Sequence, residues 1–473
     1  MEIRSSSKIA VVGAGTMGVG IAQVAAASGH QVVVIDRVET ALAKGCETLK
    51  GSLDQLVKRG RIDAEQAEAA IARVQWSPQI EAASDCALVI EAIVERLEVK
   101  QALFAELENI VGEEALLATN TSSLSVDDIA KPLGMPSRFL GLHFFNPVPA
   151  MKLVEVVASA ATSPQTVEAV TSLMRGWGKH PVTVRDVPGF IVNRIARPYY
   201  AEAFLAWDEG VQPAVVDAAL TGSGGFRMGP LMLADMIGHD INYAAAVSVH
   251  EALQPRARFR PQGMQGELVE QGHLGRKSGQ GIYRYETDMP RPRVREGNAG
   301  AVIQLPAVPA AAADLIVELS APVDPKLDPG VLSVDGQRIA LGDGRSLAAR
   351  EDALHVPSSS LLVATVRDEA AAQAAGGLAG ALGKELLIVP DRPGQIVLRT
   401  YAQIANGAVD AVLEDIANAG AIDEAMVYGA NYPVGPLAWA ARTGTQRVRK
   451  ALAHIASETG DRLYEPADDW TSL

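Results

Sequence analysis

The feature that most limits what this chain can fold into is a glycine-rich turn at residues 13–18, with the sequence GAGTMG. An apolar run, Lys8–Val12, precedes it and reads as a buried strand, and a helical pattern follows it directly. A second apolar run, Val32–Ile35, then ends at Asp36. A glycine triplet alone is weak evidence, but strand, glycine turn, helix, strand and terminal acid in this order predict a dinucleotide-binding unit.

Each glycine of the turn has a separate task in such a unit. The first permits a tight turn, the second lets the backbone approach a pyrophosphate, and the third lets the helix pack close to the strand. Free N–H groups and the dipole at the start of the helix favour the anion. The residues predicted to bind the pyrophosphate are Gly13, Gly15, Thr16, Met17 and Gly18.

The acid at the end of the second strand predicts which dinucleotide is bound. Asp36 is placed to accept hydrogen bonds from the adenosine ribose, and its charge would repel a 2′-phosphate. The sequence therefore favours NAD over NADP, although Arg37 next to it leaves NADP open.

A histidine and a glutamate stand in two neighbouring apolar segments. His143 lies in the run GLHFFNP, and Glu155 lies in LVEVV, twelve residues later. Ionisable groups rarely enter such segments unless they are paired. The Asn146–Pro149 turn is the right length to fold one segment against the other. We expect a His–carboxylate pair, in which one imidazole nitrogen is held and the other is a base near neutral pH. A buried structural histidine is the alternative reading.

The first 185 residues alternate strands and helices. Further strands are predicted at residues 87–90, 116–119, 139–142 and 154–157, and a helix at 97–111. This order predicts a doubly wound, mostly parallel α/β sheet, a Rossmann fold, in which ligands bind at the carboxyl ends of the strands. The motif at residues 120–123 (NTSS) falls at such an end, which favours a contact with substrate or nicotinamide over a plain polar loop.

Composition excludes several classes of partner. The formal net charge of −14 argues against nucleic acid and anionic membrane, both of which need basic surface. Two cysteines, Cys46 and Cys86, in no metal-like spacing fit a reducing compartment, and no metal site is predicted. The N-terminus carries no apolar signal-peptide core, and no apolar run is long enough to span a membrane. We expect a cytoplasmic protein.

These motifs together resemble one family. The glycine turn, EAIVE at residues 91–95, NTSS, the His143 run and PGFIVNR at residues 188–194 are similar to the NAD-dependent L-3-hydroxyacyl-CoA dehydrogenases. The likeness is collinear from about Lys8 to Tyr285. It implies a Rossmann domain followed by a smaller helical domain, with the active site between them, and NAD as cofactor.

The resemblance implies a role for individual residues. It makes His143 the catalytic base, Glu155 its partner, and Ser122 and Asn193 neutral groups that hold the substrate oxygens. It implies coenzyme A contacts at Ser52, Lys58 and Ser122, where the basic cluster at residues 58–61 could equally be solvated cations ending a helix. The cofactor contacts that it implies beyond the glycine turn and Asp36 are Glu95, Lys100, Asn120, Ser122, Asn146 and Lys277.

Other functions remain open at this point. The same fold could act on a free 3-hydroxy acid or a sugar acid. The absence of a coenzyme A binding site would favour this alternative. A non-catalytic NAD-binding structural protein is the third reading, and the joint presence of His143, Glu155, Ser122 and Asn193 argues against it.

The second half of the chain repeats part of the first without its chemistry. Residues 391–399 (DRPGQIVLR) echo residues 186–194 (DVPGFIVNR), and Gly-Pro-Leu at 435–437 echoes 229–231, with a register shift of one residue. Leu398 replaces Asn193, and no glycine turn or His143 motif precedes the second copy. We expect a non-catalytic copy that forms a pseudo-dimer with the first inside one chain, as helical domains of two subunits do in single-copy relatives. A homo-oligomer is also compatible.

The predicted domains follow from these patterns: a Rossmann domain at 1–185, a helical domain at 186–285, a linker at 286–312, a small degenerate α/β element at 313–389 and a second helical copy at 390–473. In the small element, strands are expected at 314–318, 361–364 and 386–389 with one Ala-rich helix, and His355 has no assigned role. The layout resembles the long bacterial form of the family. That form implies 3-hydroxyadipyl-CoA and phenylacetate catabolism, with 3-hydroxybutyryl-CoA and fatty-acid β-oxidation as the alternative.

Overall fold

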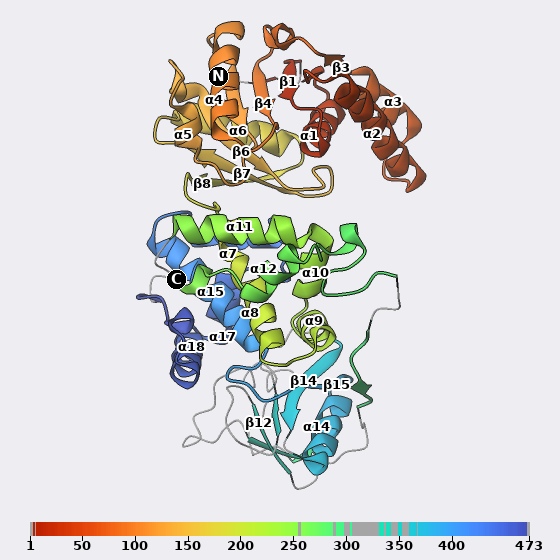
Figure 1. Ribbon diagram of the computed structural model, residues 1–473, viewed down its shortest axis with the longest axis vertical. Helices are drawn as coiled ribbons and strands as arrows, with labels where there is room; N and C mark the ends of the chain where they lie inside the picture. The colour runs from red at the N-terminus through yellow and green to blue at the C-terminus, as the bar shows by residue number, and fades with distance from the viewer. Residues whose placement is uncertain are drawn as a thin grey trace. The chain divides into compact units, whose positions relative to one another are not determined.

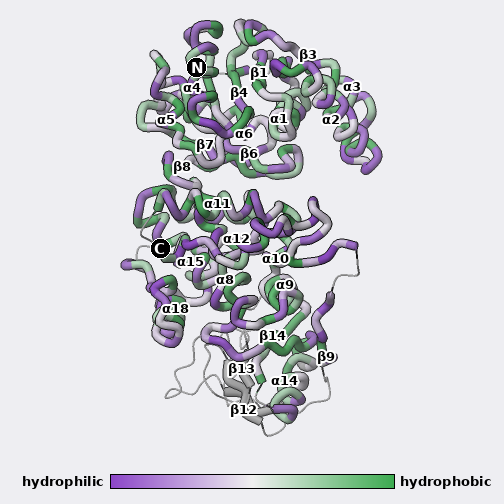
Figure 2. The backbone as a smooth tube through the Cα atoms, viewed as in Figure 1, coloured by the Kyte–Doolittle hydropathy of each residue, from purple (hydrophilic) through white to green (hydrophobic). Residues whose placement is uncertain are grey.

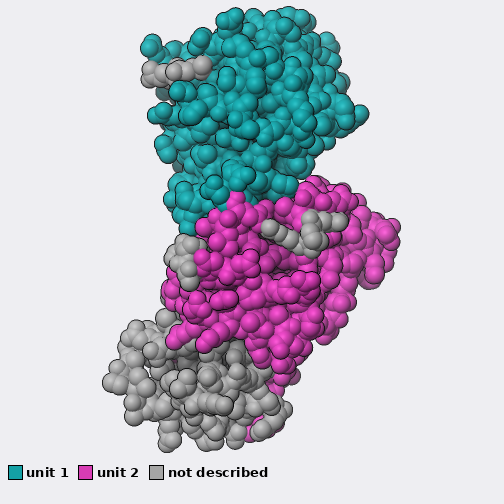
Figure 3. Space-filling model, turned by 90° about the vertical axis from the view of Figure 1, so that its left-hand side faces the viewer, with its two compact units in different colours: residues 1–192, 415–429 teal, residues 193–414, 430–473 magenta. Residues whose placement is uncertain are grey.

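The computed structural model describes residues 3–4, 6–253, 257–286, 290–297, 303–304, 331–334, 337–341, 349–351, 359–366 and 368–470. The predicted strand at 314–318 and His355 lie outside these ranges. The chain forms two compact units, one of residues 1–192 and 415–429, the other of residues 193–414 and 430–473 (Figure 3).

The first unit is built on one twisted sheet, as the sequence predicts (Figure 1). The strand order is β3-β2-β1-β4-β5-β6-β7-β8, and neighbours pair in parallel except β6 with β7. This is the predicted doubly wound, mostly parallel arrangement. Its strands are β1 (Ile9–Val12), β2 (Val32–Ile35), β3 (Val74–Ser77), β4 (Leu88–Glu91), β5 (Leu116–Thr119), β6 (Phe139–Phe144), β7 (Leu153–Ala158) and β8 (His180–Arg185).

Helices bury both faces of this sheet because its strands are apolar on both sides. Leu140 and Leu142 of β6 belong to the hydrophobic core that also takes residues from four helices. Phe139 points to the other face, where it packs edge-on against Phe104 with ring centroids 4.7 Å apart. The helices of the unit are α1 (Thr16–Ala27), α2 (Glu39–Lys58), α3 (Ala64–Ala72), α4 (Leu97–Ile110), α5 (Val126–Ala130) and α6 (Pro164–Gly176).

One helix of this unit comes from the C-terminal repeat. Helix α16 (Ala419–Gly429) packs against β7 and β8. His180 of β8 contacts Glu424 at 2.8 Å and stacks on the ring of Tyr428 at 4.3 Å between centroids. Gly429 is needed here because a Cβ at this position would overlap the side chain of Leu153. The sequence indicates a repeat at this place but not that one of its helices completes the sheet domain.

The second unit contains the first helical copy and the second copy without α16. The first copy contributes the short α7 (Val192–Ile195), which starts at the unit boundary, and then α8 (Arg197–Asp208), α9 (Pro213–Gly222), α10 (Pro230–Ile237), α11 (His239–Ala252) and α12 (Gly263–Glu270). The second contributes α15 (Val397–Leu413), α17 (Pro436–Thr443) and α18 (Thr445–Thr459). No helix in the described ranges combines the length and the apolar character needed to cross a bilayer.

The two copies share backbone conformation as well as sequence. Phe190 and Gln395 occupy equivalent places after Pro-Gly and both have positive φ, 46° and 51°. Gly238 and Gly444, which precede α11 and α18, have φ of 102° and 97°. Positive φ is uncommon for residues with a side chain, so its recurrence at Phe190 and Gln395 supports the repeat inferred from sequence.

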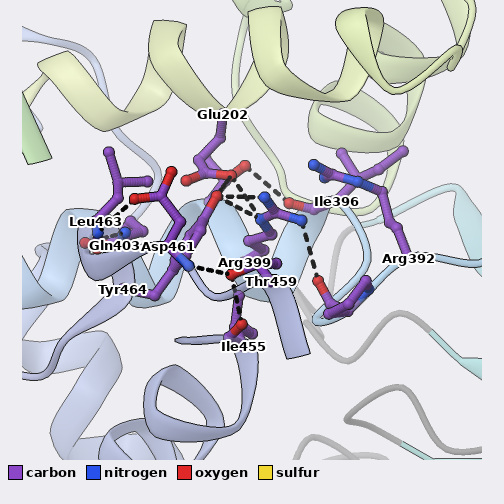
Figure 4. Close-up of polar contacts among 12 residues, drawn as sticks. Glu202, Arg392, Ile396, Arg399, Gln403, Ile455, Thr459, Asp461, Leu463 and Tyr464 are labelled. Atoms are coloured by element: carbon purple, nitrogen blue, oxygen red, sulfur yellow. Dashed lines mark hydrogen bonds and ion pairs between the residues drawn. The ribbon is translucent and has the colours of Figure 1, made fainter. Parts of the chain in front are cut away.

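Reciprocal ion pairs join the copies. Arg194 of the first copy contacts Glu414 of the second at 2.6 Å, and Arg399, the equivalent of Arg194, contacts Glu209 of the first at 3.2 Å. The second pair belongs to a buried cluster in which Arg399 also contacts Glu202 at 2.9 Å and the hydroxyl of Tyr464 at 2.7 Å (Figure 4).

This cluster makes the two copies depend on each other. Burial raises the pKa of Glu202, although the charge of Arg399 opposes the rise. Removing one partner of such a pair would leave an uncompensated buried charge, which costs about 3–5 kcal/mol. Helix α15 also packs along α8, so the copies are joined by apolar and ionic contacts within one chain.

A small mixed sheet belongs to the same unit. Its order is β10-β11-β12-β13-β14-β15-β9, and the parallel neighbours β14 and β15 flank α14 (Glu369–Ala381) in sequence. The predicted strands at 361–364 and 386–389 and the Ala-rich helix between them are confirmed. The strands are β9 (Val294–Arg295), β10 (Ile303–Gln304), β11 (Val331–Val334), β12 (Gln337–Leu341), β13 (Ala349–Glu351), β14 (Leu361–Val366) and β15 (Glu385–Ile388).

Truncation after Tyr285 tests whether the second copy is structural. The truncated chain would lose α16 from the sheet unit and would leave Glu202 buried without Arg399. We expect it to aggregate or to form new dimers, because the faces that α15 and α16 cover would become wet. Light scattering and activity of the truncated chain measure this. A monodisperse, fully active monomer would contradict it.

Candidate active site

The predicted His143–Glu155 pair is present and follows from strand register. Strands β6 and β7 are antiparallel, and His143 lies directly opposite Glu155 in the ladder. The imidazole Nδ1 is 2.6 Å from Glu155 Oε2, with side-chain exposures of 8% and 0%. An ionised carboxylate only accepts hydrogen bonds, so Nδ1 carries the proton and Nε2 is left as a base.

The other carboxylate oxygen is held as well. Glu155 Oε1 accepts the backbone N–H groups of Ile191 and Val192, each at 3.0 Å. Those groups follow Phe190, whose positive φ turns the chain toward the carboxylate. The rings of Phe145 and Phe190 lie 4.5 and 5.7 Å from the imidazole. The carboxylate is therefore fixed at both oxygens, and the imidazole is enclosed by aromatic rings.

The glycine turn forms the mouth of a cavity. A Cβ on Gly13, which has φ of 112°, would meet Ala92 O at 2.5 Å, and a Cβ on Gly18 would overlap Gly13 O. Gly15 is the N-cap of α1 and has no side chain to cover the free N–H groups of the first turn. Gly15 and Thr16 are exposed, and Met17 is half-buried. The cavity beside them measures about 1020 Å³, which is ample for a nucleotide.

Asp36 is oriented by the same turn. Its Oδ2 accepts the N–H of Ala14 at 2.9 Å, and its Oδ1 accepts the N–H of Val38 at 3.0 Å. Asp36 lines the cavity, so its carboxylate charge faces the place where a ribose would bind. Arg37, which left NADP open, contacts Glu106 at 2.9 Å. Its charge is thus already compensated, although the pair is exposed and weak.

A buried lysine organises the ends of β4 and β5. Lys100 is 1% exposed and contacts Glu91 at 2.6 Å and Glu95 at 3.1 Å. Lys100 does not line the cavity, so the structure gives it the task of holding these carboxylates. The direct contact with the cofactor that the resemblance implies stays a prediction. Glu91 was not among the predicted site residues, and its signal in the sequence is its place at the end of a strand, where it is the last residue of β4.

Glu95 in turn fixes the loop that carries Ser122. Its Oε1 accepts the Thr121 hydroxyl at 2.6 Å and the backbone N–H groups of Ser122 and Ser123 at 2.8 and 3.1 Å. Burial alone would raise the pKa of Glu95, but the charge of Lys100 and these hydrogen bonds hold the pKa below its usual value. The carboxylate is therefore ionised at neutral pH.

Four more of the predicted residues lie in the first unit. Asn120 Oδ1 accepts the N–H of Phe144 at 2.9 Å, which ties β5 to the strand of His143, and Asn146 is exposed in the following turn. Ser52 and Lys58 lie on α2, half-buried and exposed, before a loop that is coloured hydrophilic in Figure 2.

Two further predicted residues belong to the second unit. Asn193 lies in α7, and Lys277 contacts Asp240 at 2.5 Å. Their proposed roles remain predictions. The first unit thus brings His143 together with Glu155, Ser122 with Glu95 and Lys100, and the glycine turn with Asp36.

Comparison with known proteins shows the family of this chain. The NAD binding domain model of 3-hydroxyacyl-CoA dehydrogenase matches residues 8–187, and the C-terminal domain model matches residues 189–285 and again 394–473. The 3-hydroxyadipyl-CoA dehydrogenase of Escherichia coli is 41% identical over 97% of this chain and 95% of its own length. The mitochondrial hydroxyacyl-coenzyme A dehydrogenase of Sus scrofa is 40% identical over 59% of this chain and 91% of its own.

Solved structures agree as well. A crystal structure of 3-hydroxybutyryl-CoA dehydrogenase from Escherichia coli superimposes with a TM-score of 0.87 and 38% identity, over 98% of this chain and 97% of that one. The chain belongs to the 3-hydroxyacyl-CoA dehydrogenase family. It is an oxidoreductase with an NAD-binding domain, and its reaction is the NAD-dependent oxidation of 3-hydroxyacyl-CoA.

The position of Asp36 predicts cofactor preference. NADH should exceed NADPH by at least roughly tenfold in kcat/KM, because a like-charge clash with the 2′-phosphate costs over ~1.4 kcal/mol. Asp36→Asn should reduce the ratio of kcat/KM with NADH to kcat/KM with NADPH. Glu39→Gln, which removes a neighbouring acid that does not line the cavity, should leave it unchanged. Steady-state kinetics with both cofactors measures this, and equal use of both by the wild type would refute it.

Proposed function

We propose that His143 is the general base for oxidation of the hydroxyl of an L-3-hydroxyacyl-CoA. Its Nε2 accepts the hydroxyl proton as the carbon–oxygen bond gains double-bond character, and NAD bound at the glycine turn would supply the acceptor for the hydride that leaves the same carbon. Glu155 stabilises the imidazolium that forms. The observation that carries the proposal is the held Nδ1, which leaves Nε2 as the basic nitrogen.

Neutral donors complete the proposed site. Ser122 and Asn193 are suited to hold the substrate oxygens, on which negative charge develops during the reaction. Ser122 is fixed by its backbone bond to Glu95, so its hydroxyl is carried by a rigid loop. Ser52 and Lys58 on α2 would receive the coenzyme A portion, where a cation close to a helix C-terminus can pair with phosphate.

We further propose 3-hydroxyadipyl-CoA as the substrate and phenylacetate breakdown as the pathway. Support comes from the relative of that name, which matches nearly the whole chain, including the second helical copy. The second copy is proposed to be non-catalytic and to make a pseudo-dimer of one chain. A cytoplasmic location fits the two free thiols, Cys46 and Cys86.

Substitution of either member of the His143–Glu155 pair, called the dyad below, tests whether His143 is the general base. His143→Ala or Glu155→Gln should lower kcat by roughly two to four orders of magnitude while NAD binding persists. His180→Gln is a matched control, because His180 also contacts a glutamate but lies under α16. Its kcat should stay near the wild-type value. Near-normal turnover of either dyad variant would show that the proton goes elsewhere.

Comparison of two substrates tests the proposed acyl group. The wild type should have a kcat/KM for 3-hydroxyadipyl-CoA at least roughly tenfold above that for 3-hydroxybutyryl-CoA, since charge-assisted hydrogen bonds to a carboxylate contribute about 1.5–3 kcal/mol. NADH formation with each thioester measures it. An equal or reversed preference would refute the substrate while leaving the dyad intact.

A further inference from the structure

One buried arginine has no carboxylate partner. Arg197, the first residue of α8, is 8% exposed. Its Nε donates to Asn193 O at 2.9 Å and its Nη1 to Asn242 O at 3.3 Å, so both bonds go to neutral carbonyls. The guanidinium lies over the ring of Tyr200, 5.2 Å from its centroid. Among the described residues, no Asp or Glu lies within ion-pair distance of it.

The other buried arginines show how unusual this is. Each of the other four in the described part of the chain has an acid: Arg138 has Glu108, Arg194 has Glu414, Arg392 has Glu209 and Arg399 has Glu202. Buried charges are normally paired, because loss of water is otherwise uncompensated. Burial lowers the pKa of Arg197, whereas the acids around Arg399 raise the pKa of that group despite its burial. An anionic group of a ligand would compensate the buried charge of Arg197.

The surroundings of Arg197 suit one small anionic group. A cavity of about 20 Å³ is lined by Arg197, Tyr200, Asn242 and Gln265, among others. That is room for about one water-sized group, the size of a carboxylate oxygen. The other two arginines that line it, Arg258 and Arg260, already contact Asp410 and Asp461. Arg197 alone among the three has its charge available.

Arg197 is also close in sequence and space to a proposed substrate residue. It follows Asn193 by one helical turn and bonds the carbonyl of that residue. In a 3-hydroxyadipyl group the reacting carbon and the terminal carboxyl carbon are three single bonds apart, about 4 Å when extended. A carboxylate at that distance from a substrate hydroxyl near Asn193 is within reach of a guanidinium on the next turn.

We propose that Arg197 binds the terminal carboxylate of the substrate, so that this enzyme selects coenzyme A thioesters of dicarboxylic acids. The planar guanidinium fork would donate a charge-assisted hydrogen bond to one carboxylate oxygen in the cavity, and a neutral acyl end offers no charge to pair with it. The inference rests on the proposed function. It names the residue that would bind the terminal carboxylate, the group that 3-hydroxyadipyl-CoA has and 3-hydroxybutyryl-CoA lacks.

The test compares an acid with its neutral isostere. Wild type, Arg197→Met and Arg197→Lys are assayed with 3-hydroxyadipyl-CoA, with its terminal amide and with 3-hydroxybutyryl-CoA. The wild type should prefer acid over amide by roughly 10–100-fold in kcat/KM. The ratio should fall to about one in Arg197→Met, and Arg197→Lys, which keeps the charge but not the fork, should lie between. A purely structural role of Arg197 would instead lower the activity on acid and amide alike and leave their ratio unchanged.

A surface arginine provides the control. Arg462→Met removes one positive charge from the same unit at a side chain that is 82% exposed and paired with Glu465, and its acid-to-amide ratio should stay at the wild-type value. If Arg197→Met keeps the wild-type ratio, the inference is wrong and the proposed substrate stands. If the wild type itself treats acid and amide alike, both are wrong, and this result does not depend on any variant folding.

Discussion

The antiparallel register of β6 and β7 is the constraint on which the chemistry of this chain depends. It sets His143 directly opposite Glu155, and no shift by one residue could preserve the pair, because such a shift turns every side chain to the other face. The carboxylate is then held at its second oxygen by Ile191 and Val192. One acid therefore joins two strands of the sheet to the segment that leads into the helical unit.

A second carboxylate, Glu95, likewise holds together the segments at the ends of β4 and β5. It gathers Lys100, Thr121 and the Ser122 backbone at the carboxyl ends of β4 and β5. Each of these two acids accepts at least three hydrogen bonds. Fixed donors and acceptors of this kind need no rearrangement during reaction, which is the main way in which enzymes stabilise developing charge.

Local patterns in the sequence predicted much of the fold and of the candidate site. They did not predict the contacts between residues far apart in the chain. The glycine turn and Asp36 come from residues within one βαβ unit, the mostly parallel sheet from the alternation of strands and helices, and the His143–Glu155 pair from a short turn between two strands. The hydrogen bond from the Ile191 backbone N–H to Glu155 joins residues 36 positions apart. It depends on the positive φ of Phe190, which cannot be predicted from the presence of a phenylalanine at that position. Burial of Lys100 and the placement of α16 on β7 and β8 likewise depend on tertiary packing. The acyl-CoA activity was implied by resemblance, and the family comparisons support it.

The tautomer of His143 is the most direct measure of the central claim, that Glu155 fixes Nδ1 and leaves Nε2 as the base. Nitrogen–proton correlation NMR on histidine-labelled protein near neutral pH reports which ring nitrogen carries the proton. The account predicts that the tautomer with its proton on Nδ1 is favoured over the tautomer with its proton on Nε2, and that this preference is lost in Glu155→Gln. A proton on Nε2 in the wild-type enzyme would contradict it.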